Sequence, residues 1–193
     1  MTTRPALRQA RGEERIEQIL RATLAVIARD GAGAVTYRSV AAEAELPLGS
    51  LTYYFSSKQE LLREALRLHV SEDADRLHAV AADLLASGAD GQQVIDTFAD
   101  VLEASHGDIA QFELYLEAAR DPELGDVAAE SLRAYEAVAV LGLRAAGVPE
   151  PERTAALLVA TIDGLSLHRR AAPGATAPMR LTMAQLLRAL SAA

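Results

Sequence analysis

Apolar residues recur at steps of three and four along most of the chain, which is the spacing of one face of an α-helix. Near the N-terminus they predict an amphipathic helix over residues 13–29, which ends at the run Asp30-Gly31-Ala32-Gly33 because glycine tolerates the left-handed conformation of a helix C-terminus. No segment shows the alternation of β-branched residues expected of a strand. The pattern therefore predicts an all-α fold. The first apolar stripe consists of Ile16, Ile19, Leu20, Leu24 and Ile27.

The helical pattern then breaks into two short helices joined by a tight turn. Thr36 is a suitable N-cap for a helix over 37–44, because its hydroxyl can accept a hydrogen bond from a first-turn amide. Pro47 fixes φ and lacks a backbone donor, so it ends that helix and opens the next, over about 48–54. This arrangement is a helix-turn-helix, whose second helix lies in the DNA major groove.

A longer helix follows at once. Ser57 and Glu60 have the spacing of a capping box, which places the start of this helix near Lys58, and its apolar stripe continues to about Leu84. The sequence thus predicts about nine helices, arranged as a three-helix helix-turn-helix head and a helical body that shares the long helix. The remaining body helices are expected near residues 91–105, 109–120, 123–146, 152–169 and 178–192.

Charge is unevenly distributed along the chain. The 193 residues carry a net charge of −8, yet residues 1–70 hold ten Lys or Arg against eight Asp or Glu, a balance of +2. Residues 71–193 hold nine against nineteen, a balance of −10. DNA affinity depends on the sign of the contacting face rather than of the whole molecule. The asymmetry fits a DNA-reading head on an acidic body, and it equally fits an ordinary solvated surface.

The run LPLGSLTYYFSSKQELL, at residues 46–62, resembles the signature of the TetR/AcrR family of bacterial transcriptional regulators, and the resemblance extends over residues 16–62. It implies a ligand-responsive DNA-binding regulator, most often a repressor, that binds a palindromic operator as a homodimer and is released by a small molecule. The predicted organisation is a disordered basic arm over 1–12, a DNA-binding domain over 13–60, and an effector-binding and dimerisation domain over 61–193.

The second short helix supplies the predicted base-reading residues, because side chains near the N-terminus of a recognition helix reach deepest into the groove. These residues are Ser50, Thr52 and Tyr53. The family resemblance adds phosphate contacts, which fix the register of the protein on the duplex. The residues at those positions are Thr36, Arg38, Tyr54 and Lys58. Half-buried packing is the alternative for the two tyrosines, and ordinary solvation is the alternative for the two cations.

Four residues depart from the family pattern. Glu45 occupies the turn where glycine is usual, and it costs about 1 kcal/mol if its backbone is left-handed. Pro47 and Leu48 replace small polar or basic residues, which removes one expected phosphate contact. Thr52 replaces a frequent aromatic residue. The base preference is therefore expected to differ from that of better-known members.

Two apolar stripes near the C-terminus are candidates for a dimer interface. In the family the last two helices pair with their two-fold mates as a four-helix bundle, and Ala160 and Gly164 are small enough for close helix approach. The alternative is that both stripes are intramolecular core. The predicted interface residues are Leu157, Leu158, Thr161, Ile162, Leu165, Leu186, Leu187 and Leu190.

Apolar residues on the body helices are candidates for the effector pocket that the resemblance implies, with ordinary core as the alternative. Glu113, Glu117, His106 and His168 fit the few oriented polar groups that such a pocket needs, and the acids suit a cationic ligand. The predicted pocket residues are Phe98, Leu102, Phe112, Tyr115, Leu116, Tyr135 and His168.

Other functions find little support in the sequence. The chain has no cysteine, its four histidines lack metal-ligand spacing, and it contains neither a nucleophile elbow nor a glycine-rich phosphate loop. We therefore expect no enzymatic activity, no metal and no cofactor. The absence of a membrane-length apolar run or signal region leads us to expect a cytoplasmic protein with no membrane partner. A helical protein-interaction module with a degenerate DNA-binding head remains the alternative function.

Overall fold

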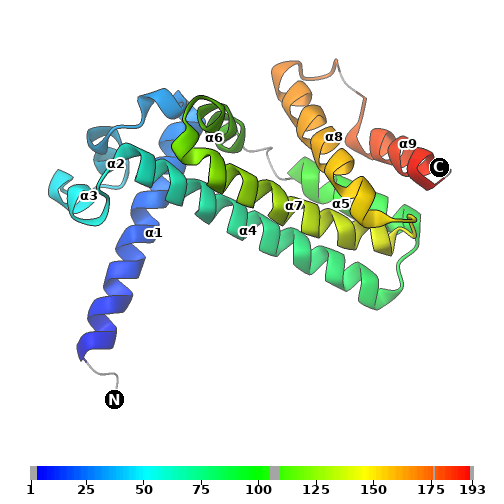
Figure 1. Ribbon diagram of the computed structural model, residues 1–193, viewed down its shortest axis with the longest axis horizontal. Helices are drawn as coiled ribbons and strands as arrows, with labels where there is room; N and C mark the ends of the chain where they lie inside the picture. Colours follow the sequence, from blue (N-terminus) through cyan, green and yellow to red (C-terminus); the bar gives the residue numbers. More distant parts are fainter. Residues whose placement is uncertain (1–3, 105–108, 176, 192–193) are drawn as a thin grey trace. The chain divides into compact units, whose positions relative to one another are not determined.

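The computed structural model describes residues 4–104, 109–175 and 177–191, which form helices and no strand (Figure 1). The prediction of an all-α fold with about nine helices is confirmed for this part of the chain. The elements, with η marking a 3-10 helix, are α1 (Arg4–Asp30), η1 (Ala32–Ala34), α2 (Tyr37–Glu43), α3 (Leu48–Tyr54), α4 (Lys58–Ser87), α5 (Gly91–Ala104), α6 (Ile109–Arg120), η2 (Pro122–Leu124), α7 (Gly125–Ala145), α8 (Pro151–Ala171) and α9 (Met179–Ser191).

The first helix begins earlier than the sequence predicts. Residues 4–12, where we expect a disordered basic arm, form the first turns of α1. Pro5 lies in the first turn, where its missing amide costs no intrahelical hydrogen bond. The segment that follows it is rich in alanine, leucine, glutamine and arginine, which are all good helix formers.

The N-terminus of α2 has the expected cap. Thr36 Oγ1 accepts a hydrogen bond from the Ser39 amide at 3.0 Å, and Ser39 Oγ accepts one from the Thr36 amide at 2.9 Å. Because each side chain satisfies the other residue's backbone donor, the start of α2 is fixed by local chemistry.

The N-terminus of α4 has a modified capping box. Ser57 Oγ accepts a hydrogen bond from the Glu60 amide at 3.0 Å, as the S-x-x-E pattern predicts. The Glu60 carboxylate, however, accepts from the amide and hydroxyl of Ser56, at 2.7 and 2.6 Å. The return contact of the box therefore lies one residue earlier than in the usual motif, and α4 still begins at Lys58.

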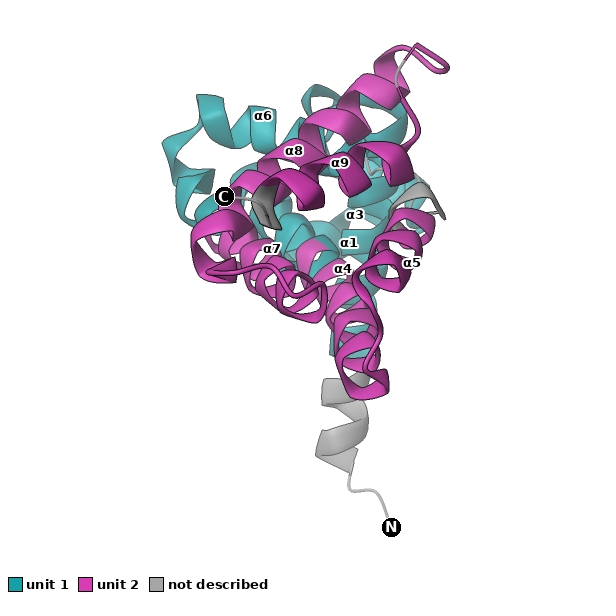
Figure 2. Cartoon of the chain, turned by 90° about the vertical axis from the view of Figure 1, so that its right-hand side faces the viewer, with its two compact units in different colours: residues 1–69, 109–129 teal, residues 70–108, 130–193 magenta. Residues whose placement is uncertain are grey.

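The chain divides into two compact units (Figure 2). Unit 1 comprises residues 1–69 and 109–129, and unit 2 comprises residues 70–108 and 130–193. Both α4 and α7 contribute residues to each unit. The sequence predicts a domain boundary after residue 60 with α6 in the body, whereas the structure groups α6 and η2 with the helix-turn-helix.

In unit 1 the core lies between α1 and the helix-turn-helix formed by α2 and α3. Each large aliphatic side chain buried here contributes about 1.5–3 kcal/mol. Two polar contacts fix the orientation of the short helices: Gln18 Nε2 donates to the Ala44 carbonyl at 2.8 Å, and the Tyr37 hydroxyl donates to the Phe55 carbonyl at 2.9 Å. The buried side chains are Ile19, Val26, Ile27, Val35, Val40 and Leu51.

Helix α6 is attached to unit 1 by contacts that are distant in sequence. The Glu113 carboxylate accepts a hydrogen bond from the Ala32 amide at 3.2 Å. The same carboxylate oxygen would lie 3.3 Å from a Cβ at Gly31, whose φ of +84° already favours glycine. Arg63 of α4 donates to the Glu123 carbonyl in η2 at 2.7 Å. These contacts tie α6 and η2 to the end of α1 and the start of α4.

In unit 2, α9 packs against α5. Arg180 of α9 forms ion pairs with Asp96, at 3.3 Å, and with Asp100. The Phe98 ring lies where a Cβ on Gly142 would approach it at 3.2 Å, so glycine permits close packing of the ring on α7. Among the described residues, no helix has the length and apolar character needed to cross a membrane.

Candidate nucleic-acid interface

The turn between α2 and α3 contains a left-handed residue. Glu45 has a φ of +54°, which is the conformation that the family pattern fills with glycine. The Leu46 amide then donates to the Ala41 carbonyl at 2.9 Å, which closes the C-terminus of α2. The chain therefore keeps the geometry of the turn although Glu45 has a Cβ.

Helix α3 has one buried and one exposed face. Leu51 is fully buried and Phe55, just after the helix, is 4% exposed, so these side chains anchor α3, which packs against α2, in the core of unit 1. At helical spacing the opposite side carries Leu48, Gly49, Thr52 and Tyr53, which are all exposed. We call these four residues the α3 face.

The predicted base-reading residues do not all lie on the α3 face. Thr52 and Tyr53 do, and Tyr53 is 80% exposed. Ser50 is half-buried at the flank of the helix. Tyr54 is also half-buried, and its ring meets that of Tyr53 edge-on with centroids 4.9 Å apart. Leu48 is a residue that sequence reasoning treated only as a lost phosphate contact, yet 47% of it is exposed on this face.

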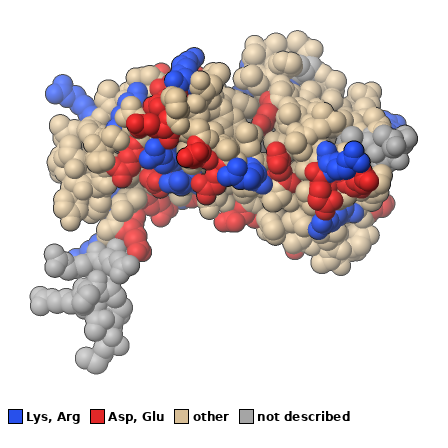
Figure 3. Space-filling model, viewed as in Figure 1, with Lys and Arg blue, Asp and Glu red and all other residues tan. Residues whose placement is uncertain are grey.

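Helix α3 itself has no charged side chain, and Figure 3 shows uncharged atoms over this end of unit 1. Cations must therefore come from its neighbours. Arg21, Arg29 and Arg67 each form an ion pair with a nearby glutamate. Arg38 and Lys58 have no ion pair within the described part of the chain, which leaves both available to an anion.

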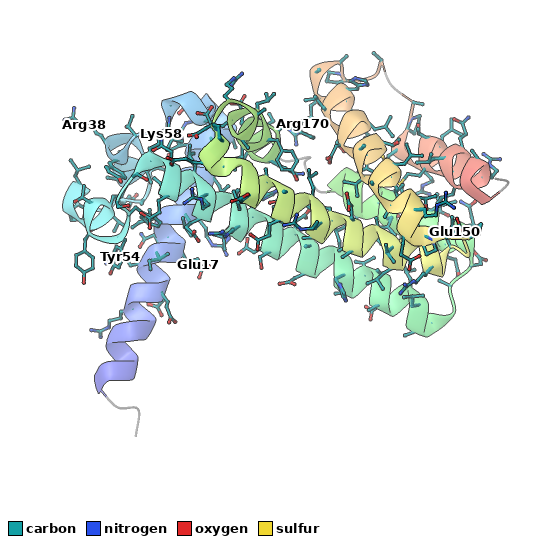
Figure 4. All side chains as sticks on the ribbon, in the orientation of Figure 1. Glu17, Arg38, Tyr54, Lys58, Glu150 and Arg170 are labelled. Atoms are coloured by element: carbon teal, nitrogen blue, oxygen red, sulfur yellow. The ribbon has the colours of Figure 1, made fainter. Side chains whose placement is uncertain are left out.

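The predicted phosphate-contacting residues gather around α3. Figure 4 labels Arg38, Tyr54 and Lys58, which come from α2, α3 and α4 in the same part of unit 1. Thr36 is exposed at the N-cap of α2. Helix N-termini favour anions because their first amides have no intrahelical acceptor, and Thr36 and Lys58 lie at two such termini.

A carboxylate already occupies part of the α4 N-terminus. Hydrogen bonds from the side chain and backbone of Ser56 hold the pKa of Glu60 below its usual value. Glu60 thus remains an anion and satisfies the Ser56 donors. The ammonium of Lys58 is not engaged by this carboxylate and can meet a phosphate here.

The predicted dimer residues differ in accessibility within the protomer. Leu158 and Leu187 are buried inside unit 2, at 7% exposure each. Leu157 is 53% exposed, and Ala160 is also exposed on the same side of α8. Half-buried positions are Thr161, Ile162, Leu165 and Leu186, and the side chain of Leu190 lies outside the described residues. Their role in a dimer stays a prediction.

The predicted pocket residues divide between the two units. Phe112, Tyr115 and Leu116 belong to α6 in unit 1, where Leu116 is 52% exposed and the other two are half-buried. In unit 2, Phe98 and Tyr135 are buried and His168 is exposed. The side chain of Leu102 and all of His106 lie outside the described residues. The pocket stays a prediction.

Two of the polar groups expected beside the pocket have other contacts. Glu113 accepts the hydrogen bond from Ala32, and Glu117 lies 3.6 Å from Arg120 in an ion pair on the same helix. Sequence reasoning missed Asp163, a half-buried residue of α8. Burial raises the pKa of Asp163 to about 6, and no hydrogen bond or ion pair joins it to another described residue. No set of three or more metal-binding side chains meets among the described residues.

Comparison with known proteins gives two family matches. Residues 19–65 match "Bacterial regulatory proteins, tetR family", and residues 89–193 match "Tetracyclin repressor-like, C-terminal domain". The HTH-type nicotine-responsive transcriptional repressor HdnoR of Paenarthrobacter nicotinovorans is 28% identical over 166 residues, which cover 83% of this chain and 86% of HdnoR.

Solved structures give the same result. The multidrug binding protein EbrR complexed with ethidium is 32% identical, with a TM-score of 0.69 over 92% of this chain and 98% of EbrR. EbrR is also known in complex with malachite green. A TetR family member from Streptomyces coelicolor A3 is 30% identical, with a TM-score of 0.72 over 92% of this chain and 98% of that one. Since one family match alone spans more than half of the sequence, this chain belongs to the TetR family of bacterial transcriptional regulators.

Proposed function

We propose that this protein is a homodimeric repressor that binds a two-fold symmetric operator and is released by a small organic molecule. The observation that carries the proposal is the uncharged, exposed α3 face flanked by Arg38 and Lys58, two cations without ion pairs in the described structure. Uncharged polar and apolar side chains can read base edges, while cations beside the groove contact phosphates. The head thus has both kinds of group that an operator requires.

A second copy of the head is needed because one recognition helix contacts too few base pairs for a specific site. The exposed side of α8 supports pairing with another protomer. It presents Leu157, at 53% exposure, beside the small residue Ala160 and near the half-buried Gly164, an arrangement that allows close helix approach. Under the proposal this surface is buried by its two-fold mate, and the operator is palindromic.

The proposed effector is a basic or cationic organic molecule. Two relatives support this class: HdnoR is nicotine-responsive, and EbrR forms complexes with ethidium and malachite green. Nicotine is an organic base and the two dyes are cations. Asp163 is our candidate for its anionic partner, because it is half-buried and has no hydrogen bond or ion pair among the described residues. A bound cation would compensate for the desolvation of this carboxylate.

The proposed response is a shift between DNA-competent and DNA-incompetent states. An effector that prefers the second state by about 1–3 kcal/mol changes DNA affinity roughly 5- to 150-fold. Helix α4 is suited to pass this preference to the head, since it begins at Lys58 beside the helix-turn-helix and contributes residues to both units. Structures with and without effector test this route, and identical separation of the two heads in both would contradict it.

The function is tested by measuring affinity for a selected operator duplex at several salt concentrations, and again with effector present. We expect affinity to fall steeply as salt rises, because bound Lys and Arg displace counterions from phosphates. Nicotine is the first effector to test; ethidium itself binds duplex DNA, so its binding is measured on the protein alone. Absence of any salt-sensitive DNA binding would instead favour a helical protein-interaction module.

A further inference from the structure

Leu48 is an exposed leucine in the first turn of the recognition helix. It follows the N-cap Pro47 and keeps 47% of its surface exposed, whereas Leu51 one turn later is fully buried. A single exposed leucine is common on protein surfaces. Leu48, however, lies on the α3 face with Thr52 and Tyr53, so under the proposed function its partner is DNA.

The neighbouring Thr52 extends the apolar character of this position. Its hydroxyl donates to the Gly49 carbonyl at 3.2 Å, so its only donor is used within the helix. Leu48 and the methyl group of Thr52 therefore form an apolar strip of two residues one helical turn apart. A helical turn rises about 5.4 Å and base pairs are spaced about 3.4 Å, so the strip spans roughly two base pairs.

The major groove offers one apolar group to such a strip. Guanine, cytosine and adenine present only donors and acceptors there, whereas thymine also presents its C5-methyl group. A leucine placed against an amide, carbonyl or ring nitrogen would leave that group without a hydrogen bond, which is unfavourable. We propose that Leu48, with the Thr52 methyl beside it, reads the methyl groups of one or two adjacent thymines in each operator half-site.

This inference rests on the proposed function and makes Leu48 a residue that determines specificity. It also explains how a recognition helix without any charged residue discriminates between sequences: part of its readout is methyl recognition. An operator that obeys this rule contains thymine at the same place in both half-sites.

The test replaces thymine by uracil, which removes only the C5-methyl group, one position at a time in the selected operator. For the wild-type dimer we expect about a fourfold loss of affinity per contacted methyl, and about sixteenfold when both half-sites are changed. Leu48→Ala should bind the thymine operator more weakly and no longer distinguish it from uracil at that position. Thr52→Ser, which removes one methyl group, should lose the distinction at the adjacent thymine.

Leu85→Ala is the matched control, because Leu85 is 42% exposed on α4 in unit 2 and should leave thymine discrimination unchanged. Thermal unfolding of each variant checks that truncation of an exposed side chain leaves the fold intact. Equal wild-type affinity for thymine and uracil at every position would overturn the inference while leaving the regulator function standing. Full discrimination retained by folded Leu48→Ala would overturn it too. Failure to select any operator would overturn both this inference and the proposed regulator function.

Discussion

At the scale of single residues, Glu45 and Asp163 each occupy a position that disfavours them. Glu45 adopts a left-handed backbone with a φ of +54°, and Asp163 is a half-buried acid without a hydrogen bond or ion pair to another described residue. The first is predictable from sequence, because the turn of a helix-turn-helix has a known backbone conformation. The second is not, since the burial of Asp163 depends on how α8 lies within unit 2.

Replacing Glu45 with glycine is expected to raise the free energy of unfolding by about 0.5–1 kcal/mol. Relief of left-handed strain, about 1–2 kcal/mol, is partly offset by the greater freedom of glycine in the unfolded chain. Ala42→Gly, at an exposed position inside α2, is the control and should lower stability by about 0.5–1 kcal/mol. Denaturant unfolding at fixed protein concentration measures the free energy of unfolding of both variants. If Glu45→Gly is less stable than the wild type, the left-handed backbone at Glu45 is not strained.

Asp163 is expected to make stability fall as pH rises between about 4 and 6. Its pKa is about 6 in the folded state and near 3.8 ordinarily, so the folded state binds the proton more tightly across this window. Asp163→Asn should therefore be more stable than wild type at pH 7, by about 1–3 kcal/mol, and the difference should shrink towards pH 4. Unfolding curves of wild type and Asp163→Asn at pH 4, 5, 6 and 7 measure this difference in stability. A difference that does not change with pH would contradict a raised pKa for Asp163.

At the scale of helices, local signals placed most of the boundaries. The cap at Thr36, the proline at position 47 and the Ser57 cap give helix starts that agree with the structure. The attachment of α6 was not predictable, because it depends on the contact between Glu113 and Ala32, 81 residues apart. Likewise residues 4–12 are expected to be disordered because this segment is basic, contains Pro5 and Gly12 and lacks an apolar stripe, yet they form the first turns of α1.

Gly49→Ala is expected to weaken DNA binding without destabilising the fold. A Cβ at Gly49 would meet nothing within 4 Å, so alanine should leave stability unchanged or raise it by up to about 1 kcal/mol. The added methyl lies on the α3 face and should weaken operator binding about tenfold, by obstructing close approach to the groove. Gly125→Ala, equally unobstructed in a helical backbone, should leave operator affinity unchanged. Equal affinity of both variants would place Gly49 away from the DNA.

Glu113→Ala is expected to loosen α6 from unit 1. Loss of a charged acceptor for the Ala32 amide should lower the free energy of unfolding by about 1–2 kcal/mol, and Glu113→Gln should restore part of it because an amide oxygen can still accept. Glu117→Ala, which breaks only a surface ion pair, should cost less than about 0.5 kcal/mol. If Glu113→Ala and Glu117→Ala lower the free energy of unfolding equally, the hydrogen bond between Glu113 and Ala32 does not anchor α6 to unit 1.

At the scale of the whole molecule, net charge is a poor guide to the partner. The chain carries −8 overall, but what a duplex would meet is an uncharged α3 with Arg38 and Lys58 beside it. Sequence reasoning located this surface through the helix-turn-helix motif, and of its three base-reading candidates Thr52 and Tyr53 are exposed whereas Ser50 is half-buried. It treated Leu48 only as a lost phosphate contact, because a motif gives positions along a helix and not which of them face solvent.

The central claim is best tested by selecting bound fragments from a random duplex pool with the wild-type protein, Tyr53→Ala and Lys58→Ala. We predict a two-fold symmetric site for the wild type. Tyr53→Ala should relax its sequence, while Lys58→Ala should weaken binding to all sequences and lower the salt slope by about one per half-site. If no fragment is enriched at low salt, or if the two substitutions change neither preference nor affinity, operator binding through α3 is contradicted.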